Sequence, residues 1–237
     1  MKRKKDNNSV NRGKLLIKDT TAFSVREAYK LLRTNIMYSS ADANSKTIVV
    51  SSPEPGAGKS TTTLNTAITF AEAGKKVLII DADMRSPQIH RALGVDNQVG
   101  LSTVLVGAAE LHRAIRPCKD KNIDILTSGK QPPNPSELLS SEKMNSILEE
   151  VSKEYDYIFI DTPPIILVSD ALILSKITSG IIIVVRENST NHKMIKESLD
   201  RISMVQTKVL GLVLTNDKVR LSKKNHYYTS AYSKYSV

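Results

Sequence analysis

The chain has 237 residues, of which 40% are apolar and 24% charged, and it contains one cysteine, Cys118. This composition is typical of an ordinary globular protein and excludes collagen-like, coiled-coil and disulfide-stabilised classes. No apolar run approaches the ~18 residues of a membrane-spanning helix, and the basic stretch Lys2–Lys5 is followed by polar residues instead of the apolar part of a signal peptide. A lone cysteine cannot form an internal disulfide. We therefore expect a cytoplasmic protein that neither spans a membrane nor is exported.

The net charge of +10 is concentrated at the two ends of the chain. Residues 1–18 hold seven Lys or Arg and one Asp, and residues 218–237 hold five Lys or Arg and no acid, so the part between them is close to neutral. Basic ends can contact nucleic acid, anionic lipid or an acidic partner, or can act only as solvated segments. Because the central part is not basic, no specific nucleic-acid binding is expected.

Short apolar runs rich in Ile, Val and Leu alternate with helical stretches along the chain. Such runs are typical of strands buried on both faces, so we predict an α/β fold with a mostly parallel sheet flanked by helices on both faces. The predicted strands are Thr47–Ser51, Val77–Asp81, Ile123–Leu126, Tyr157–Asp161, Ile181–Val185 and Val209–Thr215. The predicted helices are Lys59–Ala73, Ser141–Glu154, Ser169–Ile177 and Asn191–Met204, with shorter ones around Leu101–Val106 and Ala109–Arg113.

A further helix is predicted ahead of the first strand, from Ser24 to about Tyr38. Its first residues, Ser24-Val25-Arg26-Glu27, form the pattern of a capping box, in which the Ser and Glu side chains satisfy each other's backbone N–H groups. Glu27, Lys30 and Arg33 recur every three residues and so lie on one side of this helix. A charged stripe of this kind can be a solvated face or a contact with another subunit.

The segment after the first predicted strand is a candidate phosphate-binding loop. Glycines at 56 and 58 allow backbone N–H groups to turn toward a polyphosphate, Lys59 supplies a cation, and the Ser60 hydroxyl can bind Mg²⁺. The segment departs from the usual pattern at Pro53, where a glycine normally opens the loop. The predicted nucleotide-binding residues in the loop are Gly56, Ala57, Gly58, Lys59, Ser60 and Thr61.

Two further strands end in acidic residues. One ends at Asp81, with Asp83 two residues further on, and the other ends at Asp161, ahead of Thr162-Pro163-Pro164. The carboxyl ends of parallel strands meet at one edge of the sheet, which is also where the phosphate loop lies. These three carboxylates can therefore surround one Mg²⁺–nucleotide complex, holding the metal directly or through water.

These three segments resemble the nucleotide motifs of the bacterial tyrosine kinases, which use a P-loop NTPase-type fold. The resemblance covers about residues 20–237 and includes Pro87, His90 and the stretch 132–139. It implies MgATP as the phosphoryl donor, with Lys59, Asp81 and Asp83 as catalytic residues. It implies Ser60, Asp81, Asp83 and Asp161 as the metal site, and it adds Asn216 as an adenine contact. Which aspartate acts as the base is left open.

The resemblance also bears on assembly. In this family a Glu-x-x-Arg-x-x-Arg pattern on the first helix contacts other subunits, and this chain has Glu27, Lys30 and Arg33 there. Lys30 lacks the planar fork of arginine, so the contact is expected to be weaker. The family further implies a homo-oligomer, a membrane-anchored activator that presents a cytoplasmic segment, recruitment to the inner face of the plasma membrane, an opposing tyrosine phosphatase, and a role in capsular or extracellular polysaccharide synthesis.

The last eleven residues contain four of the eight tyrosines: Tyr227, Tyr228, Tyr232 and Tyr235. The residues between them are polar and lack apolar periodicity, so we predict a disordered tail. Phosphate acceptors, stacking on nucleic acid and a contact with a partner all fit exposed tyrosines. We predict three parts: a flexible basic segment over 1–20, a P-loop kinase domain over 21–217, and a tyrosine-rich tail over 218–237.

The sequence thus predicts a protein-tyrosine kinase that phosphorylates its own tail in trans and other proteins. The alternative is a MinD- or ParA-like partitioning ATPase. Such proteins commonly have an additional lysine two residues before the first loop glycine, where this chain has Glu54. A non-catalytic nucleotide-binding adaptor is a third possibility, which loss of Lys59 or of the strand-end acids would favour. All of these residues are present.

Overall fold

Seven strands form one sheet in the computed structural model, which describes residues 16–18, 20–40 and 46–215. The strands are β1 (Thr47–Ser51), β2 (Val77–Asp81), β3 (Arg116–Cys118), β4 (Ile123–Leu126), β5 (Tyr157–Asp161), β6 (Gly180–Arg186) and β7 (Val209–Thr215). Their order across the sheet is β3-β4-β2-β5-β1-β6-β7. All neighbours pair in parallel except β3 and β4. The predicted mostly parallel sheet is confirmed.

All six predicted strands are present, and β6 is one residue longer at each end than predicted. The sequence analysis missed β3, which has Pro117 at its centre, opposite Asp124 of β4. Proline cannot donate a ladder hydrogen bond, so a proline-containing run is tolerated in a strand at the edge of a sheet. Its edge position is a property of the tertiary structure, and the local sequence does not reveal it.

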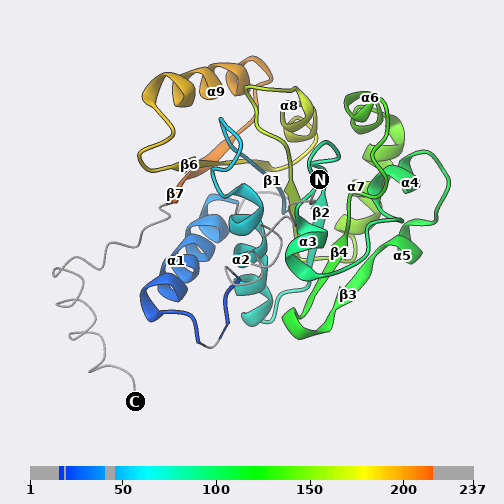
Figure 1. Cartoon of the computed structure of the whole chain (residues 1–237), viewed down its shortest axis with the longest axis horizontal. Helices are drawn as coiled ribbons and strands as arrows, with labels where there is room; N and C mark the ends of the chain where they lie inside the picture. Colours follow the sequence, from blue (N-terminus) through cyan, green and yellow to red (C-terminus); the bar gives the residue numbers. More distant parts are fainter. Residues whose placement is uncertain (1–15, 19, 41–45, 216–237) are drawn as a thin grey trace, which may run out of the picture.

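Helices cover both faces of the sheet (Figure 1). They are α1 (Phe23–Ser39), α2 (Lys59–Glu72), α3 (Ile89–Leu93), α4 (Leu101–Leu105), α5 (Leu111–Ala114), α6 (Pro135–Leu139), α7 (Glu142–Ser152), α8 (Asp170–Ser175) and α9 (His192–Met204). The short helices α3 and α6 were not predicted, because five residues are too few to show a helical period. Helices α1, α2 and α3 pack on one face, and α4 to α9 pack on the other.

The predicted capping box at Ser24 is wrong. Helix α1 begins at Phe23, and the residue before it, Ala22, has ψ 136° and no side-chain cap. The backbone N–H groups of Val25 and Arg26 donate to the Ala22 carbonyl oxygen over 3.0 and 3.2 Å. Ser24 therefore lies inside the first turn, where its hydroxyl cannot cap the helix. A turn in which the Thr21 N–H donates to the Lys18 carbonyl precedes this start.

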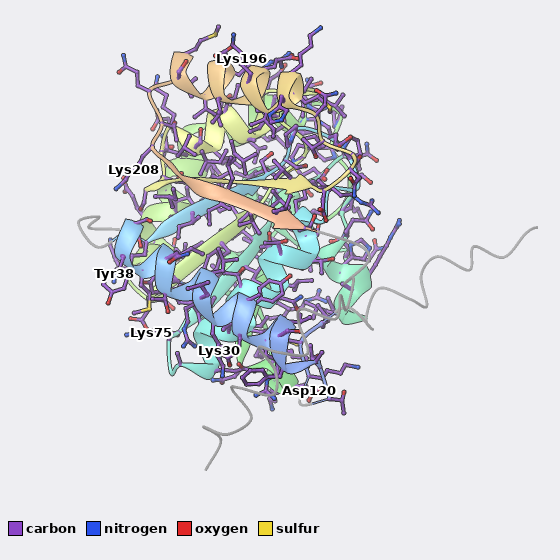
Figure 2. All side chains as sticks on the ribbon, turned by 90° about the vertical axis from the view of Figure 1, so that its left-hand side faces the viewer. Lys30, Tyr38, Lys75, Asp120, Lys196 and Lys208 are labelled. Carbon is purple, nitrogen blue, oxygen red and sulfur yellow. The ribbon has the colours of Figure 1, made fainter. Side chains whose placement is uncertain are left out.

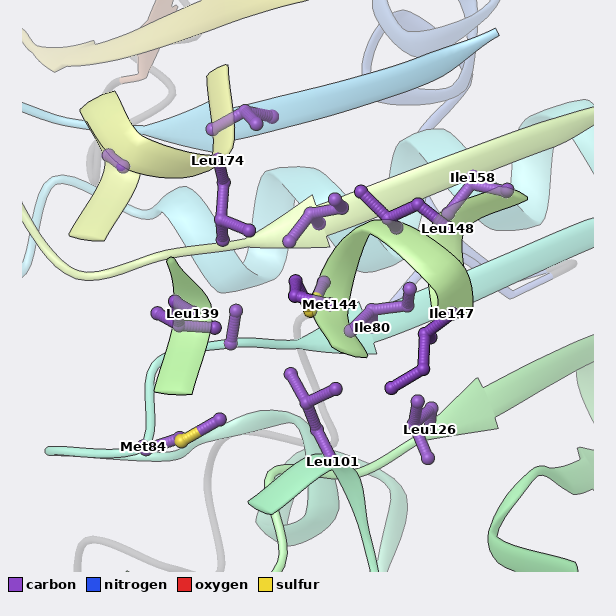
Figure 3. Close-up of a cluster of buried hydrophobic side chains, with 14 of the residues drawn as sticks. Ile80, Met84, Leu101, Leu126, Leu139, Met144, Ile147, Leu148, Ile158 and Leu174 are labelled. Atoms are coloured by element: carbon purple, nitrogen blue, oxygen red, sulfur yellow. The ribbon is translucent and has the colours of Figure 1, made fainter. Parts of the chain in front are cut away.

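The strands alternate between two hydrophobic cores. In β1, Ile48 and Val50 face α1 and α2, whereas Val49 faces the opposite helices. Figure 3 shows Met144, Ile147 and Leu148 of α7 over this second face of the sheet. On the first face, the Phe70 ring of α2 lies 4.2 and 5.4 Å from the rings of Tyr157 and Phe159 in β5, measured between centroids. Both cores together fix the central strands, and with them the site at their carboxyl ends.

Candidate active site

The phosphate loop connects β1 to α2 and contains two glycines in the left-handed region. Gly56 has φ 78°, and Gly58, the residue before α2, has φ 95°. A residue with a Cβ atom is strained at such angles, which explains the glycines at these positions. The Thr62 N–H donates to the Gly58 carbonyl oxygen over 2.9 Å and closes the first turn of α2. The backbone N–H groups in the first turn of a helix can bind an anion, and α2 begins directly after this loop.

The sheet topology brings the three predicted aspartates together. Strand β5 lies between β1 and β2, and Asp81 stands directly opposite Asp161 in the register. Asp161 is also opposite Val50, two residues before the loop begins at Ser52. The carboxylates of Asp81 and Asp161 are fully buried, and Asp83 is 3% exposed. The acids therefore lie at the mouth of the phosphate loop, as the strand-end pattern predicts.

Lys59 is the cation of this acidic site. Its Nζ lies 2.8 Å from Oδ2 of Asp83, and the residue is only 8% exposed. The other oxygen of Asp83 accepts the Ser86 N–H over 2.9 Å. The carboxylate of Asp81 accepts the N–H groups of Asp83 and Ile89, each over 3.2 Å. Backbone donors thus hold Asp81 and Asp83 in place, whereas the buried carboxylate of Asp161 has only the hydroxyls of Ser60 and Thr63 as nearby donors in the described part of the chain.

The charges in this site shift three pKa values. Burial, with the nearby charges of Asp161 and Asp83, raises the pKa of Asp81 well above its ordinary value. Burial also raises the pKa of Asp161, although the positive charge of Lys59 and the hydroxyls of Ser60 and Thr63 oppose the shift. Burial lowers the pKa of Lys59, but the negative charges of Asp161 and Asp83 outweigh it, so the net shift is upward. The site therefore contains more carboxyl groups than cationic side chains, which favours the binding of an added cation.

The buried carboxylate of Asp161 fits a metal-bound nucleotide. A buried negative charge is costly unless a cation or strong hydrogen bonds compensate it, and the donors beside Asp161 are two hydroxyls. In nucleotide sites Mg²⁺ binds through one or two carboxylates together with waters and the phosphates of the nucleotide. In residues 16–18, 20–40 and 46–215, no three His, Cys, Asp or Glu side chains are arranged to hold a metal ion by themselves.

Arg85 belongs to a network that the sequence analysis did not find. Its Nε and Nη2 donate to the two carboxylate oxygens of Asp170 over 3.0 and 3.2 Å, and Asp170 is fully buried at the start of α8. The Ser136 hydroxyl of α6 donates to Asp170 over 2.6 Å and accepts from Arg85 over 2.9 Å. This network fastens the segment that carries Asp81 and Asp83 to α6 and α8. Its members are far apart in the sequence, so no local pattern indicates it.

The predicted subunit-contact residues lie on α1, which packs against α2. Lys30 Nζ lies 2.8 Å from the carboxylate of Glu27, and both side chains are about two-fifths exposed. Arg33 instead donates to the Thr69 carbonyl oxygen of α2 over 2.7 Å. Figure 2 looks onto α1 beside β7, with Lys30 and Tyr38 labelled. Asn216 and the four tail tyrosines lie outside the described residues.

The fold and the loop with its acids define a P-loop-type nucleotide-binding domain, and a family model described as an AAA domain matches residues 45–219. The tyrosine-protein kinase YwqD of Bacillus subtilis strain 168 is 39% identical over 202 residues, which is 85% of either chain. The putative tyrosine-protein kinase CapB of Staphylococcus aureus is 36% identical over 90% of this chain and 93% of its own length. The chain therefore belongs to the bacterial tyrosine-protein kinase family, and it is a tyrosine-protein kinase.

Solved structures agree with this assignment. The kinase domain of Escherichia coli tyrosine kinase ETK is 30% identical and has a TM-score of 0.83, over 94% of this chain and 85% of that chain. The chimerical protein CapA2B2 is 36% identical with a TM-score of 0.79, over 85% and 87%. McdA, at 20% identity and a TM-score of 0.59, shares the fold alone. No helix in the described part of the chain is long and apolar enough to cross a membrane.

Proposed function

We propose that the chain transfers the γ-phosphoryl group of MgATP to Tyr227, Tyr228, Tyr232 and Tyr235 on a second copy of itself, and to tyrosines of other proteins. The observation that supports this proposal most is the meeting of Lys59, Asp81, Asp83 and Asp161 at the phosphate loop. A loop with one buried lysine and three buried acids suits a polyphosphate with a divalent cation.

In this proposal, the side chains of the site have separate roles. Bound Mg²⁺ would neutralise charge on the phosphates, with Ser60, Asp81, Asp83 and Asp161 as the residues that hold it directly or through water. Lys59 leaves Asp83 and stabilises negative charge on the transferred group. Tyrosine hydroxyls, with a pKa near ~10, are protonated at neutral pH, so the attacking phenol needs a base. Asp81 or Asp83 accepts this proton.

The end of β7 supports the tail as a substrate. The Thr215 hydroxyl donates to the Ala57 carbonyl oxygen of the phosphate loop over 2.7 Å, so the chain leaves the described part beside the site. The residues from Thr215 to Tyr227 span at most roughly 40 Å when extended. That length allows a tail tyrosine to enter the site of an adjacent copy.

Transfer in trans is tested by mixing two variants. The first carries Lys59→Met and keeps the tail, and the second keeps Lys59 but has Phe at 227, 228, 232 and 235. We expect no tail phosphate on either variant alone with MgATP, and phosphate on the tail of the Lys59→Met variant after mixing, because only the second variant can catalyse. Mass spectrometry of the separated chains locates the phosphate. If mixing leaves that tail unmodified while wild type becomes modified, transfer occurs within one chain.

Helix α1 is the proposed contact between copies, through Glu27, Lys30 and Arg33. Glu27→Lys places two lysines where an acid–base pair stands, so we expect the unphosphorylated protein to shift toward the monomer in light scattering and its tail phosphorylation to slow. The expected size of the effect is a few-fold, because exposed charge pairs contribute only about 0.2–1 kcal/mol.

Glu110→Lys is a matched control for this experiment. Glu110, the residue before α5, pairs with Arg113 of α5 at the same spacing and a distance of 2.8 Å, and α5 packs on the opposite face of the sheet. Its reversal is expected to leave the mass unchanged. Equal masses for wild type and Glu27→Lys would show that the charged stripe of α1 is a solvated face.

The proposal also covers the location of the kinase in the cell, its regulation and the process that it regulates. We propose that a membrane-anchored activator recruits the chain to the inner face of the plasma membrane through a cytoplasmic segment, that a tyrosine phosphatase opposes it, and that the pair regulates capsular or extracellular polysaccharide synthesis. The similarity to CapB and to the chimerical protein CapA2B2 supports this part of the proposal. We expect the isolated chain to be weakly active and a peptide of the activator to raise its rate of tail phosphorylation.

A further inference from the structure

The turn between β6 and α9 lies against the outer side of the phosphate loop. It runs from Arg186 to Thr190, and α9 follows after its cap residue Asn191. Arg186 Nη1 donates to the Gly56 carbonyl oxygen over 3.1 Å. The Arg186 backbone N–H donates to the Thr190 hydroxyl over 2.8 Å. The same arginine thus contacts the loop with its side chain and orders the turn with its backbone.

Glu54 connects the opening of the loop to this turn. Its Oε1 accepts the Thr190 hydroxyl over 2.7 Å and the Ser189 hydroxyl over 2.9 Å. The Thr190 hydroxyl has one proton to donate, and its contact with the Arg186 N–H orients that proton toward Glu54. The Glu54 carbonyl oxygen accepts the Ser52 hydroxyl over 2.7 Å. Loop positions 54 and 56 are therefore both attached to the turn.

The sequence of the loop allows these contacts to affect the backbone that binds the phosphates. Prolines at 53 and 55 flank Glu54 and restrict the backbone on both sides. Pro53 occupies the position where the usual loop has a glycine, and it is buried. A movement of the Glu54 side chain is therefore transmitted to the Gly56–Gly58 segment, which must present its N–H groups to the phosphates. A charge-assisted hydrogen bond is roughly twice as strong as a neutral one, which suits a carboxylate in this place.

Charge alone argues against Glu54 as a ligand of the nucleotide. A carboxylate near a polyphosphate repels it, and this carboxylate is directed to the turn instead. We propose that Glu54 and Thr190 are positioning residues that set the conformation of the phosphate loop and thereby the affinity for MgATP and MgADP. The proposal rests on the nucleotide site and not on the identity of the acceptor tyrosines.

Direct binding of MgADP to the full chain tests this proposal. Thr190→Val removes the hydroxyl and keeps the shape, and we expect it to weaken binding by about fivefold, the order of one lost hydrogen bond. Thr190→Ser keeps a hydroxyl and is expected to restore affinity. Glu54→Ala is expected to weaken binding by about tenfold. Glu54→Gln still accepts both hydroxyls but as a neutral acceptor with weaker hydrogen bonds, so its affinity is expected to lie between that of Glu54→Ala and that of wild type.

The kinetics of tail phosphorylation give a second readout. For Thr190→Val we expect the KM for MgATP to rise several-fold with a smaller change in kcat, because the reacting groups themselves are untouched. Thr178→Val, which removes the hydroxyl that donates to Ser175 at the other end of β6, is the matched control and leaves affinity unchanged.

Two results would overturn the proposal. One is wild-type affinity for both Thr190→Val and Glu54→Ala. The other is equal weakening by Thr190→Val and Thr190→Ser, which would make the hydrogen bond irrelevant. Far-ultraviolet circular dichroism and thermal unfolding of each variant separate a local effect on the loop from a loss of fold. Because MgADP binding needs no acceptor, this experiment gives its answer even if the tail proves not to be the substrate.

Discussion

Lys59→Met is expected to reduce tyrosine phosphorylation by at least about 100-fold, the order of losing one preorganised charge at a reacting group. Lys59 is the cation nearest the strand-end acids, with its Nζ 2.8 Å from Asp83. Methionine has a similar length and no charge, so it leaves the developing negative charge on the transferred phosphoryl group without this partner. Phosphotyrosine formed per minute from MgATP, measured by mass spectrometry, gives the ratio.

Lys153→Met is the matched control for this loss. Lys153 is exposed after the end of α7, and the same chemical change there is expected to leave the rate unchanged. Circular dichroism shows whether the Lys59→Met chain is folded. A folded Lys59→Met chain with near wild-type phosphotyrosine formation would contradict the assignment of the site.

Asp161→Asn is expected to stabilise the fold while it removes most of the activity. The wild-type carboxylate is fully buried, and burial raises its pKa although the charge of Lys59 and the hydroxyls of Ser60 and Thr63 oppose the shift. An acid whose pKa is raised in the folded state favours the protonated form there, so its ionisation costs stability. The neutral amide avoids the cost of ionising a buried group, so we expect the variant to be more stable at neutral pH. Loss of the proposed metal-holding carboxylate is expected to lower the transfer rate by about 100-fold.

The difference in stability between wild type and Asp161→Asn is expected to depend on pH. Below the ordinary Asp pKa of about 3.9, the carboxyl group is protonated in both the unfolded and the folded state, so wild type and Asp161→Asn are expected to unfold at similar temperatures. As the pH rises through the raised pKa, wild type loses stability relative to the variant, and the difference in Tm grows toward pH 7.

Thermal unfolding without nucleotide and metal, from acid to neutral pH, measures this difference. Asp200→Asn is the control, because Asp200 is exposed on α9, and we expect no change in its pH dependence. A lower Tm for Asp161→Asn at pH 7 would show that the carboxylate stabilises the fold.

Much of the site was accessible from the sequence because its signals are local. A strand buried on both faces appears in the sequence as an apolar run. The residue that ends the run lies at the carboxyl end of that strand, whatever the order of the strands in the sheet. Gly56, Gly58 and Lys59 follow such a run, and Asp81 and Asp161 end two others. The same reasoning placed six strands correctly and put helices on both faces. The start of α1 failed, because a turn before it, and not Ser24, determines where the helix begins.

Only the tertiary structure decided which strands are neighbours, and therefore which side chains meet. The register that sets Asp81 opposite Asp161 joins strands 80 residues apart, with β5 inserted between β1 and β2. The Arg85–Asp170 pair and the Glu54–Thr190 contact also cross long stretches of chain. Local propensity and periodicity extend over a few residues, whereas these contacts form because packing two cores on one twisted sheet brings distant segments to a common edge. The sequence determined the chemistry of this kinase, and the packing of its sheet determined the geometry in which that chemistry is held.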